Sequence, residues 1–275
     1  QRQMCIRDSY GSEAGQLRLL HQERFRSGEW SSLEPMLEAF LNNRPADLPA
    51  PTHACIAVAG PVRQSEARIT NLPWRLREAD LAKAAGTERL ELVNDFGVLI
   101  YGLPHFDGNQ QVILQKGHQD KGPVAILGAG TGLGMARGLQ SERGLVALAS
   151  EGGHREFAPR NESEWELACW LKQDLGISRL SIERIVSGTG LGHVAHWLLQ
   201  KPDAAVHPLR SVAEAWRRNS SNDLPAQVSV AAEGGDPLMQ RALQLWLEAY
   251  GAAAGDLALQ ELSLIHISEP TRHLL

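Results

Sequence analysis

The sequence predicts an α/β fold built from short buried strands and amphipathic helices. Two apolar runs have the length of a strand, Ala54–Ala59 and Val124–Leu127, and each run ends at a glycine. Near-continuous apolar runs are typical of strands covered on both faces of a sheet. Glu162–Leu175 instead carries apolar residues at the spacing of one helix face. Alternation of such strands and helices indicates helix layers packed around a sheet.

The composition is that of a globular enzyme with one large domain or two small ones. Of the 275 residues, 43% are hydrophobic and 21% are charged, which is ordinary for a soluble domain. A formal net charge of −5 gives no general attraction to nucleic acid or an anionic membrane. Cys5, Cys55 and Cys169 show no metal-ligand spacing, and no apolar run approaches the length of a membrane span. We therefore expect a cytoplasmic protein with reduced thiols.

The two ends do not continue the patterns beside them. Gln1–Ser9 and Leu262–Leu275 have the character of translated sequencing-adapter read-through. We expect both segments to be artefacts, and therefore the chain to be an internal fragment of a longer protein. Both are set apart from the fold prediction.

The first third of the chain predicts strands and helices that lead to an acidic residue. Gln16–Phe25 is compatible with an edge strand, and Leu33–Leu41 carries a helical stripe of apolar residues after two serines. A helix is expected over Arg77–Ala85 and a strand over Leu90–Val93. Asp95 follows that strand, where open α/β sheets bind ligands. Asp95 is also of a type that caps helices, so both roles remain open.

A glycine-dense segment follows the Val124 strand, in the sequence V-A-I-L-G-A-G-T-G-L-G. Glycines after a strand let backbone N–H groups approach a phosphate, and Thr131 adds a hydroxyl donor. The spacing matches a dinucleotide-binding loop only loosely, because no acidic residue is convincingly placed about 20 positions later. No Gly-Lys-Ser/Thr closes the loop, so it is not a Walker loop. A tight structural turn between strands is the competing interpretation.

An acid and an imidazole follow the next predicted strand, Leu145–Ala149. Glu151 and His154 are separated by two glycines, which let both side chains face one pocket. Glu151 could equally be an exposed turn residue, and His154 a structural histidine.

The remainder of the chain is mainly helical in pattern. Ile182–Leu191 contains a Gly-x-Gly turn into a helix around Val194–Leu199. Glu183 lies in this segment and could equally form a surface ion pair with the arginine beside it. Pro202–Leu224 is more polar and is interpreted as a surface excursion. Asp236 opens a long helix to about Leu259 with a continuous apolar face.

Six short motifs in order resemble bacterial glucokinase, the ATP-dependent branch of the sugar kinases with the hexokinase and actin fold. They are A-C-I-A-V-A-G-P-V, I-T-N-L-P-W, L-V-N-D-F, I-L-G-A-G-T-G-L-G, E-G-G-H-x-x-F-A-P and I-E-R-I-V-S-G-T-G-L. Together they span Ala54 to Leu191, and weaker similarity extends to about Gln260. The repressor-like sugar kinases carry a zinc site of clustered cysteines, so the chain is similar to the zinc-free branch.

The resemblance implies a sugar site made of five side chains. Asp95 would be the general base that takes the proton of the primary hydroxyl of glucose. Asn94 would hold neighbouring hydroxyls with its amide. Glu151, His154 and Glu183 would complete the hydrogen bonds around the sugar. The five side chains are expected to converge on one pocket.

The resemblance also implies a nucleotide site and a two-domain fold. Its phosphate loop would comprise Gly128, Gly130, Thr131 and Gly132, and Mg²⁺ would bridge the phosphates of ATP. A small α/β domain is expected over residues 10–104 and a large one over residues 105–261, with the ligands in the cleft between them. The phosphate loop that begins family members and the later adenosine segment are missing, so we expect this polypeptide to phosphorylate glucose poorly or not at all.

Three alternatives remain beside glucose phosphorylation. The chain could be a kinase for another hexose or an amino sugar. It could also be a non-catalytic sugar-binding regulator of the same fold. A dinucleotide-dependent oxidoreductase depends only on the loose glycine pattern. Enzymes similar to this chain are often dimers, so a homodimer is expected.

Overall fold

The computed structural model describes residues 4–13, 16–69, 72–106, 109–116, 122–142, 144–218, 223–261 and 267–270. Its contacts divide the chain into two compact units, Gln1–Val98 and Leu99–Leu275. The division falls inside helix α3 (Asp95–Gly102), a little before the expected boundary at Pro104. Each unit has its own buried apolar cluster.

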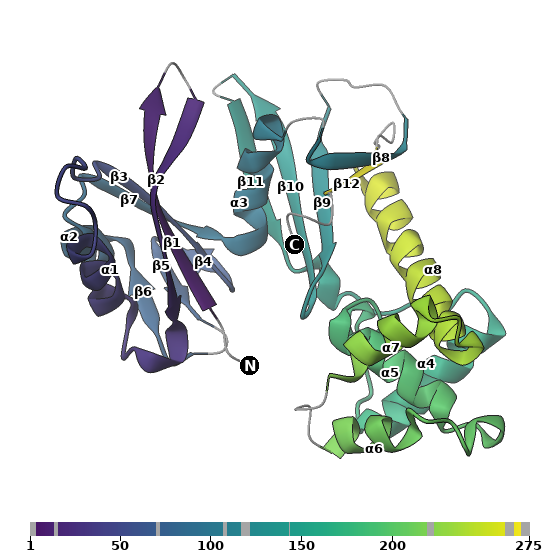
Figure 1. Ribbon diagram of the computed structural model, residues 1–275. Helices are drawn as coiled ribbons and strands as arrows, with labels where there is room; N and C mark the ends of the chain where they lie inside the picture. Colours follow the sequence, from purple (N-terminus) through teal and green to yellow (C-terminus); the bar gives the residue numbers. More distant parts are fainter. Residues whose placement is uncertain are drawn as a thin grey trace. The chain divides into compact units, whose positions relative to one another are not determined.

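The described residues of unit 1, drawn in purple to blue in Figure 1, form three small sheets and two α-helices before α3. Its elements are β1 (Met4–Glu13), β2 (Gln16–Arg26), α1 (Leu33–Asn42), β3 (His53–Val58), β4 (Val62–Arg63), β5 (Glu66–Arg68), β6 (Arg75–Arg77), α2 (Glu78–Ala85) and β7 (Arg89–Asn94). The strands β1 and β2 form an antiparallel hairpin, β4, β5 and β6 form an antiparallel sheet, and β3 pairs with β7 in parallel.

The parallel pair β3 and β7 positions the Asn94-Asp95 segment. A parallel pair needs a crossover connection, and here it passes through β4 to β6 and α2. Gly86 caps the C-terminus of α2, and its φ of 61° lies in the left-handed region that favours glycine. The pairing runs to Val58 opposite Asn94, so β7 ends level with the end of β3.

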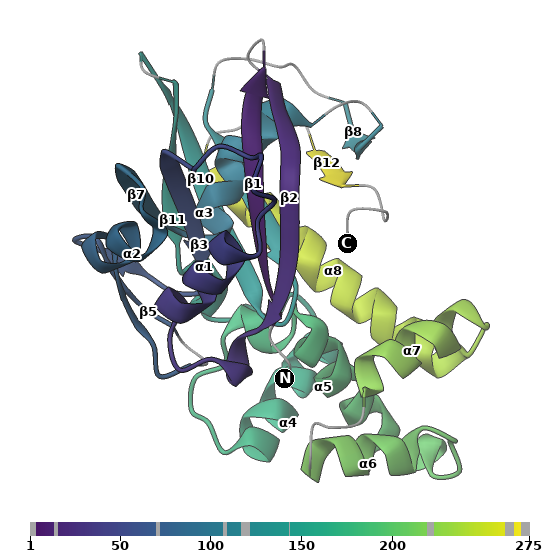
Figure 2. The same ribbon diagram turned by 60° about the vertical axis from the view of Figure 1, so that its left-hand side comes forward.

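The β1–β2 hairpin is a two-stranded sheet in the described part of the chain (Figure 2). It packs against α1: the His21 ring stacks on Phe40 with centroids 5.1 Å apart, and Asn43 Nδ2 donates to Glu23 Oε1 at 2.9 Å. The strand expected over Gln16–Phe25 is confirmed as β2. Strand β1 includes Met4–Ser9, which the sequence analysis had set apart from the fold.

One expectation for unit 1 is wrong. Strand β3 was expected to be covered on both faces, but its residues alternate between buried and exposed. Ile56 and Val58 are buried, whereas Cys55 and Ala57 are exposed. The apolar run arises because its outward positions are small residues, alanine and cysteine, which cost little when left in water.

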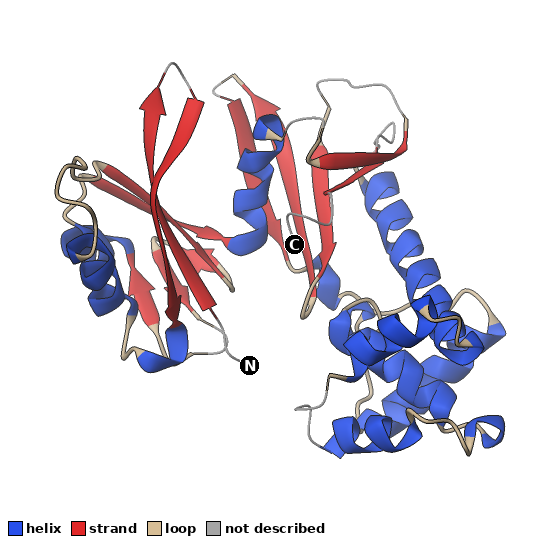
Figure 3. Cartoon of the chain, in the orientation of Figure 1, coloured by secondary structure: helices blue, strands red, loops and turns tan. Residues whose placement is uncertain are grey.

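Unit 2 combines strands with a group of helices, which are separated by colour in Figure 3. Its elements after α3 are β8 (Gln111–Gln115), β9 (Val124–Ala129), β10 (Leu133–Ser141), β11 (Gly144–Ser150), α4 (Glu162–Leu175), α5 (Gly188–Leu199), α6 (Arg210–Arg218), α7 (Leu224–Glu233), α8 (Pro237–Gln260) and β12 (Ile267–Pro270). The sheet order is β11-β10-β9, all antiparallel, and β12 pairs with β8.

Helix α5 is the centre of the helical part of unit 2. Every residue from Gly190 to Leu199 is buried, as expected of a helix that is surrounded by others. Helices α4, α6, α7 and α8 all contact it. The long helix α8, drawn in yellow, runs from these helices and contacts β9 (Figure 1).

Helices α4 and α8 are confirmed at the expected positions, and two details of this region are wrong. The helix Glu162–Leu175 was expected to carry its apolar residues on one face, but its Trp165 is 61% exposed, whereas the neighbouring Glu164 is buried and pairs with Arg160. Pro202–Leu224 was expected to be a surface excursion, but it contains α6, which buries Trp216. In the ranges given above, none of the helices has both the length and the apolarity of a membrane span.

Candidate functional site

Three of the predicted site residues lie together in unit 2. His154 Nε2 is 3.5 Å from Glu151 Oε2, and His154 Nδ1 is 3.8 Å from Glu183 Oε1. The imidazole therefore has a carboxylate beside each of its nitrogens. Both distances are longer than an ordinary hydrogen bond, so the polar atoms can still bond a ligand. The side chains of Glu151 and His154 are 67% and 58% exposed, which makes them accessible.

The paired glycines between Glu151 and His154 allow this turn to pack directly against β10. A Cβ on Gly153 would collide with the backbone carbonyl of Leu133, and one on Gly152 would lie 2.6 Å from the Met135 sulfur. The turn is closed by a hydrogen bond from His154 N–H to the Glu151 carbonyl at 2.9 Å. Only glycine permits such a close approach, so the two glycines place the acid and the imidazole on the end of the sheet.

The glycine-dense segment forms a β-hairpin turn, as the competing structural interpretation expected. Ala129 of β9 pairs with Leu133 of β10, and Gly130-Thr131-Gly132 connects the two strands. Gly130 N–H donates to the Gly132 carbonyl at 2.9 Å. Gly130 and Thr131 are exposed. This turn can present backbone groups and one hydroxyl to a ligand.

Glu183 connects the hairpin turn to the carboxylate–imidazole cluster. One carboxylate oxygen, Oε2, accepts a hydrogen bond from Leu133 N–H at 3.1 Å, and the other, Oε1, faces His154. A Cβ on Gly132 would collide with Oε2. Glu183 is therefore held against the turn. Its carboxylate faces Leu133 N–H and His154, not the neighbouring arginine with which a surface ion pair was considered.

The start of helix α5 also lies against the hairpin turn. Gly188 N–H donates to the Gly130 carbonyl at 2.8 Å. Ser187 caps the helix by accepting from Gly190 N–H at 2.9 Å, and its hydroxyl donates to the Glu183 carbonyl at 2.7 Å. The N-terminus of a helix carries a partial positive charge that favours anions. Sequence reasoning did not single out Ser187, although a serine before Gly-x-Gly at a helix start is a recognisable cap.

Asn94 and Asp95 belong to unit 1, at the junction of β7 and α3. Asn94 Oδ1 accepts from Phe96 N–H and Gly97 N–H, both at 3.0 Å, and its Nδ2 donates to the Gly60 carbonyl at 3.1 Å. This is the hydrogen-bond pattern of an N-cap. The capping role that the sequence left open for Asp95 therefore falls mainly to Asn94. Asp95 Oδ1 also accepts from Phe96 N–H at 3.0 Å.

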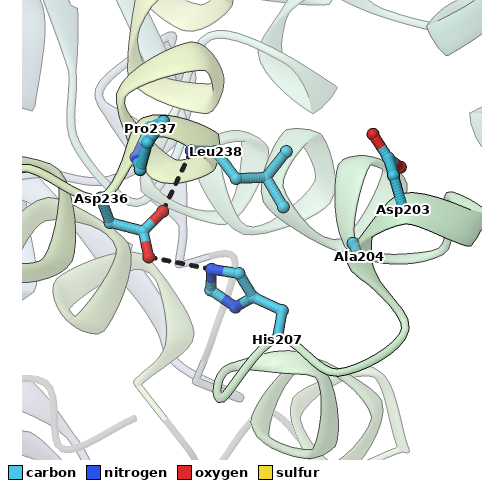
Figure 4. A pocket seen from close by; sticks show the side chains of 6 residues that line it. All are labelled: Asp203, Ala204, His207, Asp236, Pro237 and Leu238. Carbon is cyan, nitrogen blue, oxygen red and sulfur yellow. Dashed lines mark hydrogen bonds and ion pairs between the residues drawn. The ribbon is translucent and has the colours of Figure 1, made fainter.

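A cavity elsewhere in unit 2 is lined by different residues (Figure 4). It has a volume of about 310 Å³ and lies at the start of α8, where His207 Nε2 and Asp236 Oδ2 are 2.9 Å apart. The described residues that line it include no member of the predicted site. In the parts of the chain that the structure covers, no group of three or more His, Cys, Asp or Glu could hold a metal ion.

Comparison with known proteins identifies the family. A family model described as Glucokinase matches residues 8–265. The chain belongs to the glucokinase family. A curated glucokinase from Nostoc sp. is 38% identical over 258 residues, which are 90% of this chain and 75% of that protein. One from Synechocystis sp. is 38% identical over 253 residues, with 88% and 71% covered.

Solved glucokinases share the fold. The glucokinase from an Antarctic psychrotroph has a TM-score of 0.74 at 27% identity and covers 94% of this chain and 77% of its own. The glucokinase from Balamuthia mandrillaris, solved in complex with glucose, has a TM-score of 0.64 at 20% identity, with 88% and 70% covered. At that identity the likeness shows the fold alone. The predicted α/β, hexokinase- and actin-like fold class is thereby confirmed.

In this member of the glucokinase family, the structure brings Glu151, His154 and Glu183 together beside the hairpin turn. Asn94 and Asp95 adjoin each other at the start of α3 in the other unit. Convergence of all five side chains on one sugar stays a prediction.

Proposed function

We propose that this chain transfers the terminal phosphoryl group of ATP to glucose and forms glucose 6-phosphate. The match of the glucokinase family model to residues 8–265 carries the proposal. Relatives that bear the name glucokinase, at 33–38% identity, support it, and they do not favour another hexose, an amino sugar or a non-catalytic regulator as the alternative.

The chemistry of the Glu151–His154–Glu183 cluster suits a sugar. A sugar hydroxyl is donor and acceptor at once. Carboxylate oxygens accept from it, and an imidazole nitrogen can either accept or donate. Because the imidazole–carboxylate distances are 3.5 and 3.8 Å, these groups are not saturated by one another. A site of this kind rejects analogues that lack a hydroxyl, since its own polar groups would then lose their partners.

Asp95 would act as the general base. Its carboxylate would accept the proton of the primary hydroxyl while that oxygen forms a bond to the terminal phosphorus and the bond from phosphorus to the bridging oxygen breaks. Asn94 would fix the position of the base, because its amide caps α3 and binds the Gly60 carbonyl. Asn94 would also contact sugar hydroxyls directly, because its amide can donate a second hydrogen bond.

Gly128, Gly130, Thr131 and Gly132 would hold the phosphates of ATP. The exposed backbone of the turn and the adjacent start of α5 offer N–H groups, a hydroxyl and a favourable dipole to an anion. ATP supplies the phosphoryl group, and Mg²⁺ neutralises its charge. Mg²⁺ in phosphoryl-transfer enzymes is held largely by the phosphates and water, so it would arrive with the nucleotide.

The proposal is tested by measuring glucose binding calorimetrically and glucose 6-phosphate formation by mass spectrometry with ATP. Asp95→Asn should lower kcat by roughly 10²–10⁴-fold, the usual contribution of a general base, and leave glucose affinity unchanged. Asp80→Asn, which alters an exposed carboxylate on α2, is the matched control and should leave both unchanged. Absence of glucose binding, or equal measurable turnover of Asp95→Asn and Asp80→Asn, would contradict the proposal.

The same assay with other hexoses and N-acetylated amino sugars measures substrate preference, and we expect glucose to be preferred. It also measures how slowly this polypeptide turns over, which stays a prediction. A homodimer and a cytoplasmic location also remain predictions, and light scattering measures the first. We expect neither nucleic acid nor a membrane as a partner, because a formal net charge of −5 gives no general attraction to these anionic surfaces.

A further inference from the structure

Two aromatic side chains of helix α8 bond backbone carbonyls beside the hairpin turn. Tyr250 Oη donates to the Leu127 carbonyl of β9 at 3.0 Å. Trp246 Nε1 donates to the Ser187 carbonyl at 2.9 Å. The two rings contact each other, with centroids 5.3 Å apart. One turn of α8 therefore bonds both the strand that enters the hairpin turn and the cap of the helix that lies against it.

The bonds made by Trp246 and Tyr250 belong to a connected network. Ser187 precedes Gly188, whose N–H donates to the Gly130 carbonyl of the turn. The Ser187 hydroxyl in turn donates to the Glu183 carbonyl. Tyr250 bonds β9 directly at Leu127, which lies three residues before Gly130 in the sequence. The strand before Gly130-Thr131-Gly132 and the helix cap that contacts Gly130 are thus both bonded to α8.

Helix α8 is itself anchored, so it can serve as a support. Met239, Ala242, Leu245, Ala249, Ala253 and Leu257 are buried along one face. Asp236 caps its start by accepting from Leu238 N–H at 3.0 Å and Met239 N–H at 2.9 Å. Near its end, Arg137 of β10 binds Glu261 at 2.9 Å. The side chains at 246 and 250 lie one turn apart on this fixed helix.

We propose that Trp246 and Tyr250 are positioning residues for the nucleotide, because they fix the hairpin turn in the arrangement that binds the phosphates of ATP. This inference rests on the proposed function and assigns the two side chains a role at that site. The carbonyls that they bond, those of Ser187 and Leu127, lie outside Gly130-Thr131-Gly132. Each acts through a backbone carbonyl, and fixing a binding loop in its bound conformation raises affinity by lowering the ordering cost.

The two side chains should differ in what they affect. Tyr250 bonds the Leu127 carbonyl of the strand that leads into the turn. Its loss should therefore lower the affinity for ATP and leave the affinity for glucose unchanged. Trp246 bonds the Ser187 carbonyl. Ser187 adjoins Gly188, whose N–H donates to the Gly130 carbonyl, and its hydroxyl donates to the Glu183 carbonyl. Loss of the Trp246 bond should therefore lower the affinity for ATP and, to a smaller extent, the affinity for glucose. A general loss of stability would not produce this split.

The test compares Tyr250→Phe and Trp246→Phe with two matched controls. Tyr101→Phe removes another tyrosine hydroxyl, which accepts from Ala147 N–H of β11 at 3.2 Å in the same sheet. Trp165→Phe changes an exposed tryptophan of α4. Affinities for ATP and glucose are measured separately by calorimetry, together with KM and kcat and the thermal midpoint.

We expect Tyr250→Phe and Trp246→Phe each to weaken ATP affinity by roughly 3–10-fold, the value of one hydrogen bond. Glucose affinity should stay within about twofold in Tyr250→Phe, and kcat at saturating ATP should be largely retained. Both controls should keep wild-type ATP affinity. Unchanged ATP affinity in Tyr250→Phe, a deletion of a single oxygen that keeps the ring, would overturn the inference even if Trp246→Phe fails to fold. Wild-type glucose binding and turnover test the proposed function separately.

Discussion

The same five residues, G-T-G-L-G, occur twice in unit 2 and adopt two different structures. Gly130–Gly134 forms a hairpin turn and the start of strand β10, whereas Gly188–Gly192 forms the first turn and a half of helix α5. The two copies touch, since Gly188 N–H donates to the Gly130 carbonyl. Identical local sequence has therefore been given opposite secondary structure at a single site.

The flanking residues explain the difference. The first copy follows the apolar strand β9. The chain reverses direction at this copy, because Leu133 pairs with Ala129 and β10 then runs antiparallel to β9. The second copy follows Ser187, whose hydroxyl accepts from Gly190 N–H and begins a helix. Glycine itself permits both conformations. The glycines supply space, and the neighbours decide the structure.

The largest predicted effect concerns the second glycine of the second copy, Gly190, which has no room for a side chain. A Cβ on Gly190 would collide with the backbone carbonyl of Ile185, and backbone cannot rotate away. Gly190→Ala should therefore lower the free energy of unfolding by about 3 kcal/mol, the upper range for overpacking. The urea denaturation midpoint measures it. A midpoint equal to that of the wild type would show that α5 can shift without cost.

The equivalent change in the first copy should affect binding more than stability. A Cβ on Gly132 would meet the carboxylate of Glu183, a side chain that can rotate away. Gly132→Ala should lower the free energy of unfolding by about 1 kcal/mol. It should lower the affinity for glucose about tenfold, because the added Cβ displaces the Glu183 carboxylate. Calorimetric titration with glucose measures this.

Gly130→Ala is the matched control for Gly132→Ala, since a Cβ there has no described neighbour within 4 Å. It should keep both stability and glucose affinity. Equal glucose affinity in the two variants would remove Glu183 from the sugar site.

The two threonines sharpen the comparison further. Both Thr131 and Thr189 are exposed, but only Thr131 lies in the turn proposed to hold phosphates. Thr131→Val should raise the KM for ATP by roughly 3–10-fold through loss of one hydrogen bond, whereas Thr189→Val should not. If both changes act equally on the KM for ATP, the start of α5 binds the nucleotide as well.

The smallest effect concerns pH and compares two helix caps. Ser187 caps α5 with a neutral hydroxyl, whereas Asp236 caps α8 with a carboxylate. Burial alone would raise the pKa of Asp236, but hydrogen bonds from Met239 N–H, the His207 ring and Leu238 N–H hold it below its ordinary value. A lowered pKa gives stability that is present above the unfolded value, about 3.9, and is lost as the pH falls through the folded value.

Asp236→Asn keeps a capping oxygen but removes the charge. The difference in unfolding free energy between wild type and Asp236→Asn should therefore shrink as the pH is lowered below about 4. Ser187→Ala should cost a constant amount over the same range. Denaturation curves between pH 3 and pH 7 measure both, roughly spanning the carboxylate range. A constant difference for Asp236→Asn would contradict the pKa shift.

Local patterns predicted the elements whose side chains decide their own structure. Helix α4 was found from its spacing, α8 from Asp236 and its apolar face, and β11 from its apolar run. Tertiary contacts decided the rest. Glu164 is buried beside Arg160, which neutralises it. One face of α6 is buried because Trp216 packs beside Gly192, where a Cβ would lie 2.7 Å from the ring.

In the candidate site, too, local sequence predicted the residues but not the tertiary contacts that position them. The residue types and their order predicted Glu151, His154 and Glu183, and the structure brings these three together. The choice of Asn94 over Asp95 as the main helix cap was not readable, because both are good caps. It depends on the Gly60 carbonyl, which comes from a distant part of the chain. The supporting bonds of Trp246 and Tyr250 likewise join residues 59 and 123 positions apart.

The β1–β2 ribbon has a practical consequence for anyone handling this polypeptide. In the described residues its two strands pair only with each other, so each outer edge offers a row of amide donors and acceptors to any extended segment that approaches. Tyr10, Leu17 and Leu19 are exposed along it. Self-association by strand addition should therefore grow with concentration, and a proline or lysine introduced at an outward edge position should keep stock solutions clear.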